Sequence, residues 1–245
     1  MKFVVCKDYD EMSQWAAEVV RKIVNEKPNA VLGLATGSTP VGMYHRLAEL
    51  CKAGEIDFSE VKTFNLDEYY PIDPSNDQSY RYFMNQNLHN HINIKPENAH
   101  VPNGSAEDAN AEGKRYDKMI EEAGGLDFQF LGSGVNGHIG FNEPDDALVA
   151  GTHLTALTEN TIEVNSRFFE KKEDVPRHAI TMGMAPILKA RKILIMISGV
   201  NKVPILNALA SGKITTQIPA TMLQMHNDVT VVTDEATAAL MTESF

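Results

Sequence analysis

Short apolar runs alternate with stretches of helical periodicity along nearly the whole chain. The runs cover residues 3–6, 30–34, 61–66, 126–131, 178–182, 192–198 and 229–233. Between them, apolar side chains recur at helical spacing, as in Met12, Trp15, Ala16 and Val19. Continuous apolar strands separated by helices are typical of a parallel sheet that is covered by helices on both faces. We therefore predict an α/β fold, a single three-layer α/β/α domain over residues 1–245 with a doubly wound, mostly parallel sheet.

The composition sets limits on the partners of such a domain. The net charge is −11, from 22 Lys and Arg against 33 Asp and Glu, which argues against general nucleic-acid binding. No apolar run approaches the length of a membrane span, and the first residues do not resemble a signal peptide. The two cysteines, Cys6 and Cys51, have no metal-ligand spacing and fit a reducing compartment. We expect a cytoplasmic protein that binds neither membrane nor nucleic acid.

Polar or glycine-rich segments follow four of the predicted strands. In a doubly wound sheet the ligand site lies outside the carboxyl ends of the strands, so these segments are expected to converge on one crevice. They are Thr36–Thr39, Asp67–Tyr70, Gly132–Glu143 and Ser198–Lys202.

The segment 131–144 holds four glycines together with Asn136, His138 and Glu143. Glycine at this density suits a sharp turn whose backbone approaches a ligand closely. His138 could exchange a proton with a substrate while Glu143 orients the imidazole, as in catalytic triads. A glycine-rich turn with a structural histidine is the alternative.

The other segments carry candidate binding groups, each with a plainer explanation. Free N–H groups and hydroxyls in Thr36-Gly37-Ser38-Thr39 would suit a phosphate, and the alternative is a capped turn between strand and helix. Asp67 is a candidate general base, or part of an exposed acidic loop. Arg167 and Lys202 could supply positive charge to an anionic substrate, or could be solvated surface groups.

Together these segments resemble the glucosamine-6-phosphate deaminase family, also called glucosamine-6-phosphate isomerases. The resemblance runs over nearly the whole chain and depends on four motifs in order: Leu34–Pro40, Phe64–Tyr69, Asn136–Pro144 and Asn165–Phe169. It implies conversion of glucosamine 6-phosphate and water to fructose 6-phosphate and ammonia. It implies no metal and no organic cofactor.

The resemblance also implies residue roles. His138 would assist opening of the pyranose ring, oriented by Glu143 and Asn136, and Asp67 would move the proton from C2 to C1. The phosphate would be held by Thr36, Gly37, Ser38 and Thr39 together with Arg167 and Lys202. Residues from about 156 to 176 would form a mobile lid over the sugar.

Two features depart from the family pattern. Some members carry Asp where this chain has Asn136, so an altered pH dependence is expected here. The hexameric, allosterically activated members place basic residues after the Asn-Glu-Pro segment, where this chain has His153 and Thr155. We therefore expect a monomer or small homo-oligomer without activation by N-acetylglucosamine 6-phosphate.

Two other functions are alternatives to this one. A 6-phosphogluconolactonase-like hydrolase shares the architecture and a related Gly-His loop, but the Phe64–Tyr69 and Phe141–Pro144 segments argue against it. A sugar-phosphate-sensing regulatory domain is disfavoured because the chain has no basic N-terminal module.

Overall fold

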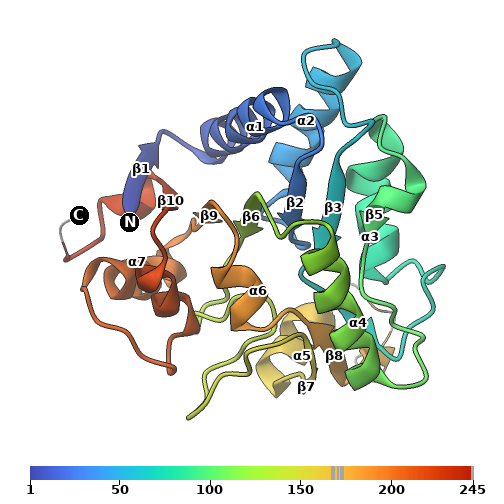
Figure 1. The fold of residues 1–245 in the computed structure, drawn as a ribbon. Helices are drawn as coiled ribbons and strands as arrows, with labels where there is room; N and C mark the ends of the chain where they lie inside the picture. The colour runs from blue at the N-terminus through green and yellow to red at the C-terminus, as the bar shows by residue number, and fades with distance from the viewer. Residues whose placement is uncertain (167–168, 170, 172–173, 244–245) are drawn as a thin grey trace.

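The computed structural model describes residues 1–166, 169, 171 and 174–243, and within them it forms two β-sheets (Figure 1). The larger sheet has seven strands, and all of its pairs are parallel. In spatial order they are β1 (Lys2–Cys6), β10 (Val229–Asp234), β9 (Ile193–Met196), β6 (Phe128–Leu131), β2 (Val31–Leu34), β3 (Lys62–Asn65) and β5 (Ala99–His100). The α/β fold with a mostly parallel sheet is thereby confirmed.

Helices cover both faces of this sheet (Figure 1). Helices α1 (Tyr9–Glu26) and α2 (Val41–Lys52) lie on one side, and α4 (Ala109–Glu122), α6 (Met184–Leu188) and α7 (Val203–Ala210) lie on the other. Helix α1 begins where the sequence indicated, because the Asp8 side chain accepts a hydrogen bond from the Glu11 N–H at 3.0 Å. Strands β2, β6 and β9 are buried along their whole length, as expected for strands between two helical layers.

The direction in which the chain crosses the sheet reverses between β2 and β6, which are neighbours. After β2 the chain moves toward the β5 edge, whereas after β6 it moves toward the β1 edge. The loops that leave these two strands therefore separate to opposite faces and open a crevice at their carboxyl ends.

The second sheet was not anticipated from the sequence. It is antiparallel and consists of β4 (Asp67–Tyr70), β8 (His178–Thr181) and β7 (His153–Ala156). The interpretation of Asp67–Tyr70 as a strand-end loop was therefore wrong. Only Leu66 separates β3 from β4, and its backbone joins the two sheets: its N–H donates to the Leu34 carbonyl at 2.9 Å, and its carbonyl accepts from the Met182 N–H at 2.7 Å.

The remaining elements are short or lie at the rim. They are α3 (Tyr80–Asn87), α5 (Glu159–Asn165), α8 (Glu235–Ala238) and the 3₁₀ helices η1 (His89–His91), η2 (Pro96–Asn98), η5 (Val200–Lys202) and η6 (Pro219–Met225). The single-domain assignment stays a prediction, as does the lid at about 156–176, part of which falls outside the described residues.

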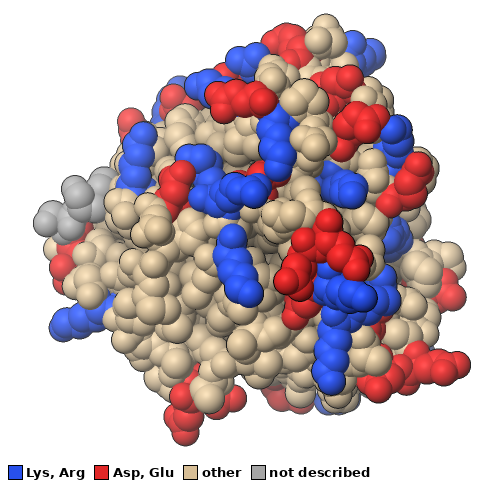
Figure 2. Space-filling view, viewed as in Figure 1, with Lys and Arg blue, Asp and Glu red and all other residues tan. Residues whose placement is uncertain are grey.

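The surface shown in Figure 2 carries acidic and basic side chains side by side, without an extended basic area on that face. Among the described residues, no helix has both the length and the apolar character that crossing a membrane requires.

Asp127 ties three elements together at the end of the sheet opposite the crevice. It is buried, and its carboxylate accepts from the Val31 N–H at 2.8 Å, from the Lys27 ammonium at 2.8 Å and from the Arg191 guanidinium. These contacts join β2, the end of α1 and the segment before β9.

We predict that Asp127→Ala lowers the free energy of unfolding by about 2–4 kcal/mol, because a buried N–H and two cations lose their acceptor together. Urea denaturation measures this loss. Glu122→Ala is the control, since its ion pair with Lys118 is exposed and should contribute less than about 1 kcal/mol. Equal effects of the two substitutions would contradict the prediction.

Candidate active site

A pocket of about 420 Å³ lies at the carboxyl ends of the parallel strands, where the crossover direction reverses. All four segments singled out in the sequence contribute to it. Its lining comprises Ala35, Thr36, Gly37, Thr39, Leu66, Asp67, Tyr80, Gly132, Ser133, Gly134, Val135, His138, Gly140, Phe141, Thr161, Asn201 and Lys202.

Most of the predicted site residues meet at this pocket, and the others fall into three groups. Asn136 and Glu143 do not line the pocket, and they are hydrogen-bonded to each other. Ser38 is not part of the lining, and its carbonyl accepts a hydrogen bond from the Tyr9 hydroxyl at 3.0 Å. Arg167 lies outside the described residues.

The glycines of the 131–144 loop make room for the imidazole of His138. A Cβ at Gly134 would lie 2.2 Å from Cε1 of that ring, so no other residue fits there without moving the histidine. Gly137 has φ of +84°, a value that favours glycine. The loop is attached to the second sheet, because the Phe141 N–H donates to Thr181 Oγ1 at 3.0 Å. Thr181 is the strand partner of Asp67, so this bond links the two predicted catalytic segments.

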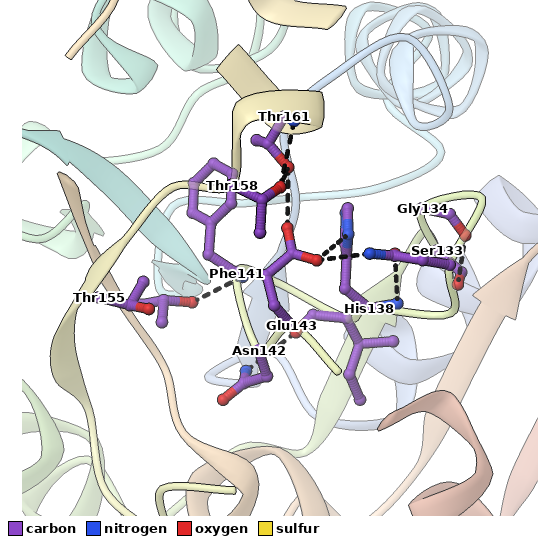
Figure 3. A network of polar contacts seen from close by, with 12 residues as sticks. Ser133, Gly134, His138, Phe141, Asn142, Glu143, Thr155, Thr158 and Thr161 are labelled. Carbon is purple, nitrogen blue, oxygen red and sulfur yellow. Dashed lines mark hydrogen bonds and ion pairs between the residues drawn. The ribbon is translucent and has the colours of Figure 1, made fainter. Parts of the chain in front are cut away.

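Glu143 is the centre of a polar network around His138 (Figure 3). Its Oε2 accepts a hydrogen bond from the Asn136 amide at 2.6 Å and lies 3.3 Å from His138 Nδ1. That second distance is within ion-pair range when the imidazole is protonated, and Nδ1 forms no hydrogen bond with the described residues in this arrangement. The Asn136 side-chain oxygen accepts from the backbone N–H of His138 at 3.2 Å. Asn136 therefore holds both the histidine backbone and the carboxylate.

Two opposing effects act on the Glu143 carboxyl. Burial by itself would raise its pKa, but the contacts and charge of His138 and the hydrogen bonds from Asn136 and Thr161 lower the pKa to about 2. Glu143 is thus ionised at neutral pH. An ionised carboxylate beside Nδ1 favours the tautomer with the proton on Nδ1, which leaves Nε2 as the basic nitrogen.

Asp67 has the opposite electrostatic character. Its side chain is 5% exposed, and burial together with the neighbouring Glu68 charge raises the pKa of Asp67 to about 8. A carboxyl group with such a pKa is a far better proton acceptor than an ordinary surface aspartate. The same carboxyl would be a weak acid–base group in the exposed acidic loop that was the alternative interpretation.

The sequence did not single out Glu68, which holds the start of α3 beside Asp67. It is buried and accepts three backbone N–H groups, from Tyr69 at 2.9 Å, Tyr80 at 2.7 Å and Arg81 at 2.9 Å. Burial raises the pKa of Glu68 to about 7 despite these bonds. Two of the bonds hold the first turn of α3, which brings Tyr80 into the pocket lining.

The turn after β2 and the start of α7 supply the groups suited to an anion. Gly37 has φ of +86°, and the Tyr9 hydroxyl binds the turn by sharing its one proton between the Ser38 and Thr39 carbonyls, each at 3.0 Å. Lys202 lines the pocket, donates to the Ser133 carbonyl, and has a pKa lowered by burial. Within the described residues, no group of three or more His, Cys, Asp or Glu side chains is placed to hold a metal ion.

Sequence comparison identifies the family of this chain. The profile of the family described as glucosamine-6-phosphate isomerases/6-phosphogluconolactonase matches residues 8–232. The chain belongs to this family. A protein named glucosamine-6-phosphate deaminase from Thermoanaerobacter sp. (strain X514) is 55% identical over 241 residues, which cover 98% of this chain and 95% of that protein. A protein of the same name from Clostridium perfringens (strain 13 / Type A) is also 55% identical, over 98% of this chain and 100% of that protein.

Two solved structures resemble this chain to different degrees. A structure described as a monomeric glucosamine-6-phosphate deaminase superposes with a TM-score of 0.95 at 42% identity, covering 98% of this chain and all of that one. A 6-phosphogluconolactonase from Thermotoga maritima superposes with a TM-score of 0.74 at 21% identity, covering 95% and 98% of the two chains. The second likeness shows a shared fold alone, whereas the relatives at 55% identity and the structure at 42% identity are named glucosamine-6-phosphate deaminases.

We predict that Glu68→Gln moves the pH dependence of the Asp67 carboxyl. Removing the negative charge beside Asp67 should lower the pKa of Asp67. In assays with glucosamine 6-phosphate, the plot of kcat/KM against pH should rise near pH 8 in the unaltered protein and at lower pH in the variant. The profile is measured from pH 5 to 10, with Glu97→Gln on the exposed η2 as control. A limb that stays in place would exclude Glu68 as a cause of the raised pKa.

Proposed function

We propose that this chain is a glucosamine-6-phosphate deaminase, in which His138 with Glu143 and Asn136 opens the sugar ring and Asp67 carries out the isomerisation. The observation that carries this proposal is the meeting of two dissimilar acid–base centres in one pocket: a histidine beside an ionised carboxylate, and a buried carboxyl with a raised pKa. The overall reaction consumes glucosamine 6-phosphate and water and releases fructose 6-phosphate and ammonia, which makes it a hydrolytic deamination.

Ring opening suits the His138 centre. With Nδ1 protonated toward Glu143, Nε2 can take the proton from the O1 hydroxyl of the pyranose and return it to the ring oxygen as the C1–O5 bond breaks. The product is the open-chain aldehyde. Glu143 stays ionised throughout and stabilises the imidazolium form that exists between the two transfers.

Isomerisation suits Asp67. In the open chain, C2 carries a proton acidified by the adjacent aldehyde. The Asp67 carboxylate removes this proton while the ammonium group of the substrate gives one proton to the aldehyde oxygen O1, and the result is a neutral enolamine. Asp67 then returns the proton to C1, which leaves an imine at C2. Water adds to this imine, and ammonia departs with the formation of the ketone. A base whose pKa is raised to about 8 matches these transfers, because its conjugate acid and the carboxylate are both accessible near neutral pH.

The phosphate of the substrate is assigned to Thr36, Gly37, Ser38 and Thr39 with Lys202, and also to Arg167. The backbone of the β2–α2 turn and the ammonium of Lys202 border the same pocket as Asp67 and His138. A half-buried ammonium and the backbone N–H groups of a turn before a helix attract a dianion even in a protein whose net charge is −11. Ser38 does not line the pocket, so its assignment depends on its place in the turn between Gly37 and Thr39.

We also propose that the protein acts as a monomer or small homo-oligomer in the cytoplasm, without metal or cofactor and without activation by N-acetylglucosamine 6-phosphate. The likeness to a structure described as monomeric supports the small assembly. His153 and Thr155, in place of basic residues, support the absence of that activation. Two cysteines without metal-ligand spacing fit a reducing compartment.

The direct test is a coupled assay for ammonia and fructose 6-phosphate, with and without N-acetylglucosamine 6-phosphate. We expect equimolar release of both products. We expect Asp67→Asn to abolish turnover while an open-chain phosphate inhibitor still binds, because the substitution removes the base and leaves the phosphate groups intact. Near-normal turnover of Asp67→Asn would remove Asp67 from this role, and release of 6-phosphogluconate from its lactone without ammonia release would favour the lactonase alternative.

Lys202→Gln tests the phosphate site. The loss of a charged hydrogen-bond donor should raise KM about 10- to 100-fold with a smaller change in kcat. Steady-state kinetics with glucosamine 6-phosphate measure both constants. Lys213→Gln, an exposed position outside the pocket, is the control. A fall in kcat with KM unchanged would place Lys202 at the reacting carbons instead of the phosphate.

A further inference from the structure

A pair of threonine hydroxyls reaches Glu143 from outside the glycine-rich loop (Figure 3). Thr161 Oγ1 lies 2.8 Å from Glu143 Oε1, and Thr158 Oγ1 lies 3.0 Å from Thr161 Oγ1. Both threonines belong to the start of α5, where Thr158 is the N-cap and also accepts the Thr161 N–H at 3.2 Å. The sequence offered no signal for them, because they stand in an ordinary polar stretch.

The chemistry of the three groups fixes the direction of these hydrogen bonds. An ionised carboxylate can only accept, so the Thr161 hydroxyl donates its one proton to Glu143. The Thr161 oxygen is then free to accept from Thr158. Thr161 is 6% exposed, so water competes little for either bond.

The two oxygens of Glu143 are held by different parts of the chain. Oε2 contacts Asn136 and His138, which belong to the loop after β6, whereas Oε1 contacts only Thr161 among the hydrogen bonds of the described residues. Contacts at both oxygens therefore restrain rotation of the Glu143 carboxylate. Without the Thr161 contact, Asn136 alone would set the angle at which Oε2 faces the imidazole.

We propose that Thr161 is a positioning residue for ring opening, whose hydroxyl orients Glu143 against His138 and makes this arrangement depend on where α5 lies. The proposal rests on the function proposed above for His138 and Glu143. It connects α5, which falls inside the segment expected to act as a lid, to an acid–base group that α5 itself does not contain.

The test compares Thr161→Val, which keeps the shape and removes the hydroxyl, with Thr161→Ser, which keeps the hydroxyl. We expect Thr161→Val to lower kcat about 10- to 100-fold, the loss typical of one hydrogen bond to a charged group, with little change in KM. Thr161→Ser should retain most of the wild-type kcat. The inhibition constant of the open-chain alditol of the substrate should be the same in all three proteins, because this compound needs no ring opening. Melting temperatures establish that both variants are folded.

A double-mutant cycle separates action through Glu143 from any other role of the threonine. In a Glu143→Gln background, Thr161→Val should cause little further loss if the hydroxyl acts through the carboxylate. Multiplicative losses would overturn the proposal, since they would mean that Thr161 acts on its own. Wild-type kcat in Thr161→Val, or equal losses in the Val and Ser variants, would overturn it as well. Full activity of Glu143→Gln would instead refute the role of Glu143 in the proposed function, and this inference with it.

Discussion

The reversal of crossover direction between β2 and β6 is the constraint on which the pocket depends. Because the chain leaves these neighbouring strands toward opposite edges of the sheet, their two crossovers diverge and leave a space between the carboxyl ends. The Thr36–Thr39 turn borders one side of that space and the Gly132–His138 loop borders the other. The sheet thus creates an opening bordered by the starts of α2 and α7, which is the place where we propose that the sugar phosphate binds.

The second sheet places the carboxyl group of Asp67 in this opening. Leu66 carries the chain directly from β3 into β4, so Asp67 enters the pocket from a strand instead of a loop. Its strand partner Thr181 also accepts the Phe141 N–H, and the loop of His138 is thereby tied to the strand of Asp67. A loop hydrogen-bonded to the strand that carries Asp67 keeps the separation of His138 and Asp67 more closely than an independent loop would. Burial in the same arrangement raises the pKa of Asp67 to about 8.

Asn136 connects the Glu143 carboxylate to the backbone of His138. Its amide donates to Glu143 while its oxygen accepts from the His138 backbone, which an aspartate could not do without sharing a proton with Glu143. The uncharged side chain leaves Glu143 as the only carboxylate among the residues described as contacting His138. Glu143 can therefore remain ionised with a pKa of about 2. The departure from family members that carry Asp at this position is compatible with an intact histidine–carboxylate pair.

Apolar periodicity and glycine-rich strand ends are local properties of the chain, so the amino-acid sequence was enough to predict the α/β class, the parallel strands and the segments that surround the pocket. It also singled out Asp67, His138 and Glu143 as chemically unusual. Three features became visible only in the folded protein: Asp67–Tyr70 is a strand of a second sheet, Glu68 holds the start of α3, and Thr161 contacts Glu143. These facts depend on contacts between residues 12 to 114 positions apart, such as Asp67 with Thr181, and on the burial that shifts each pKa. No single stretch of sequence specifies these contacts or this burial, because they arise when separate segments pack together and exclude water.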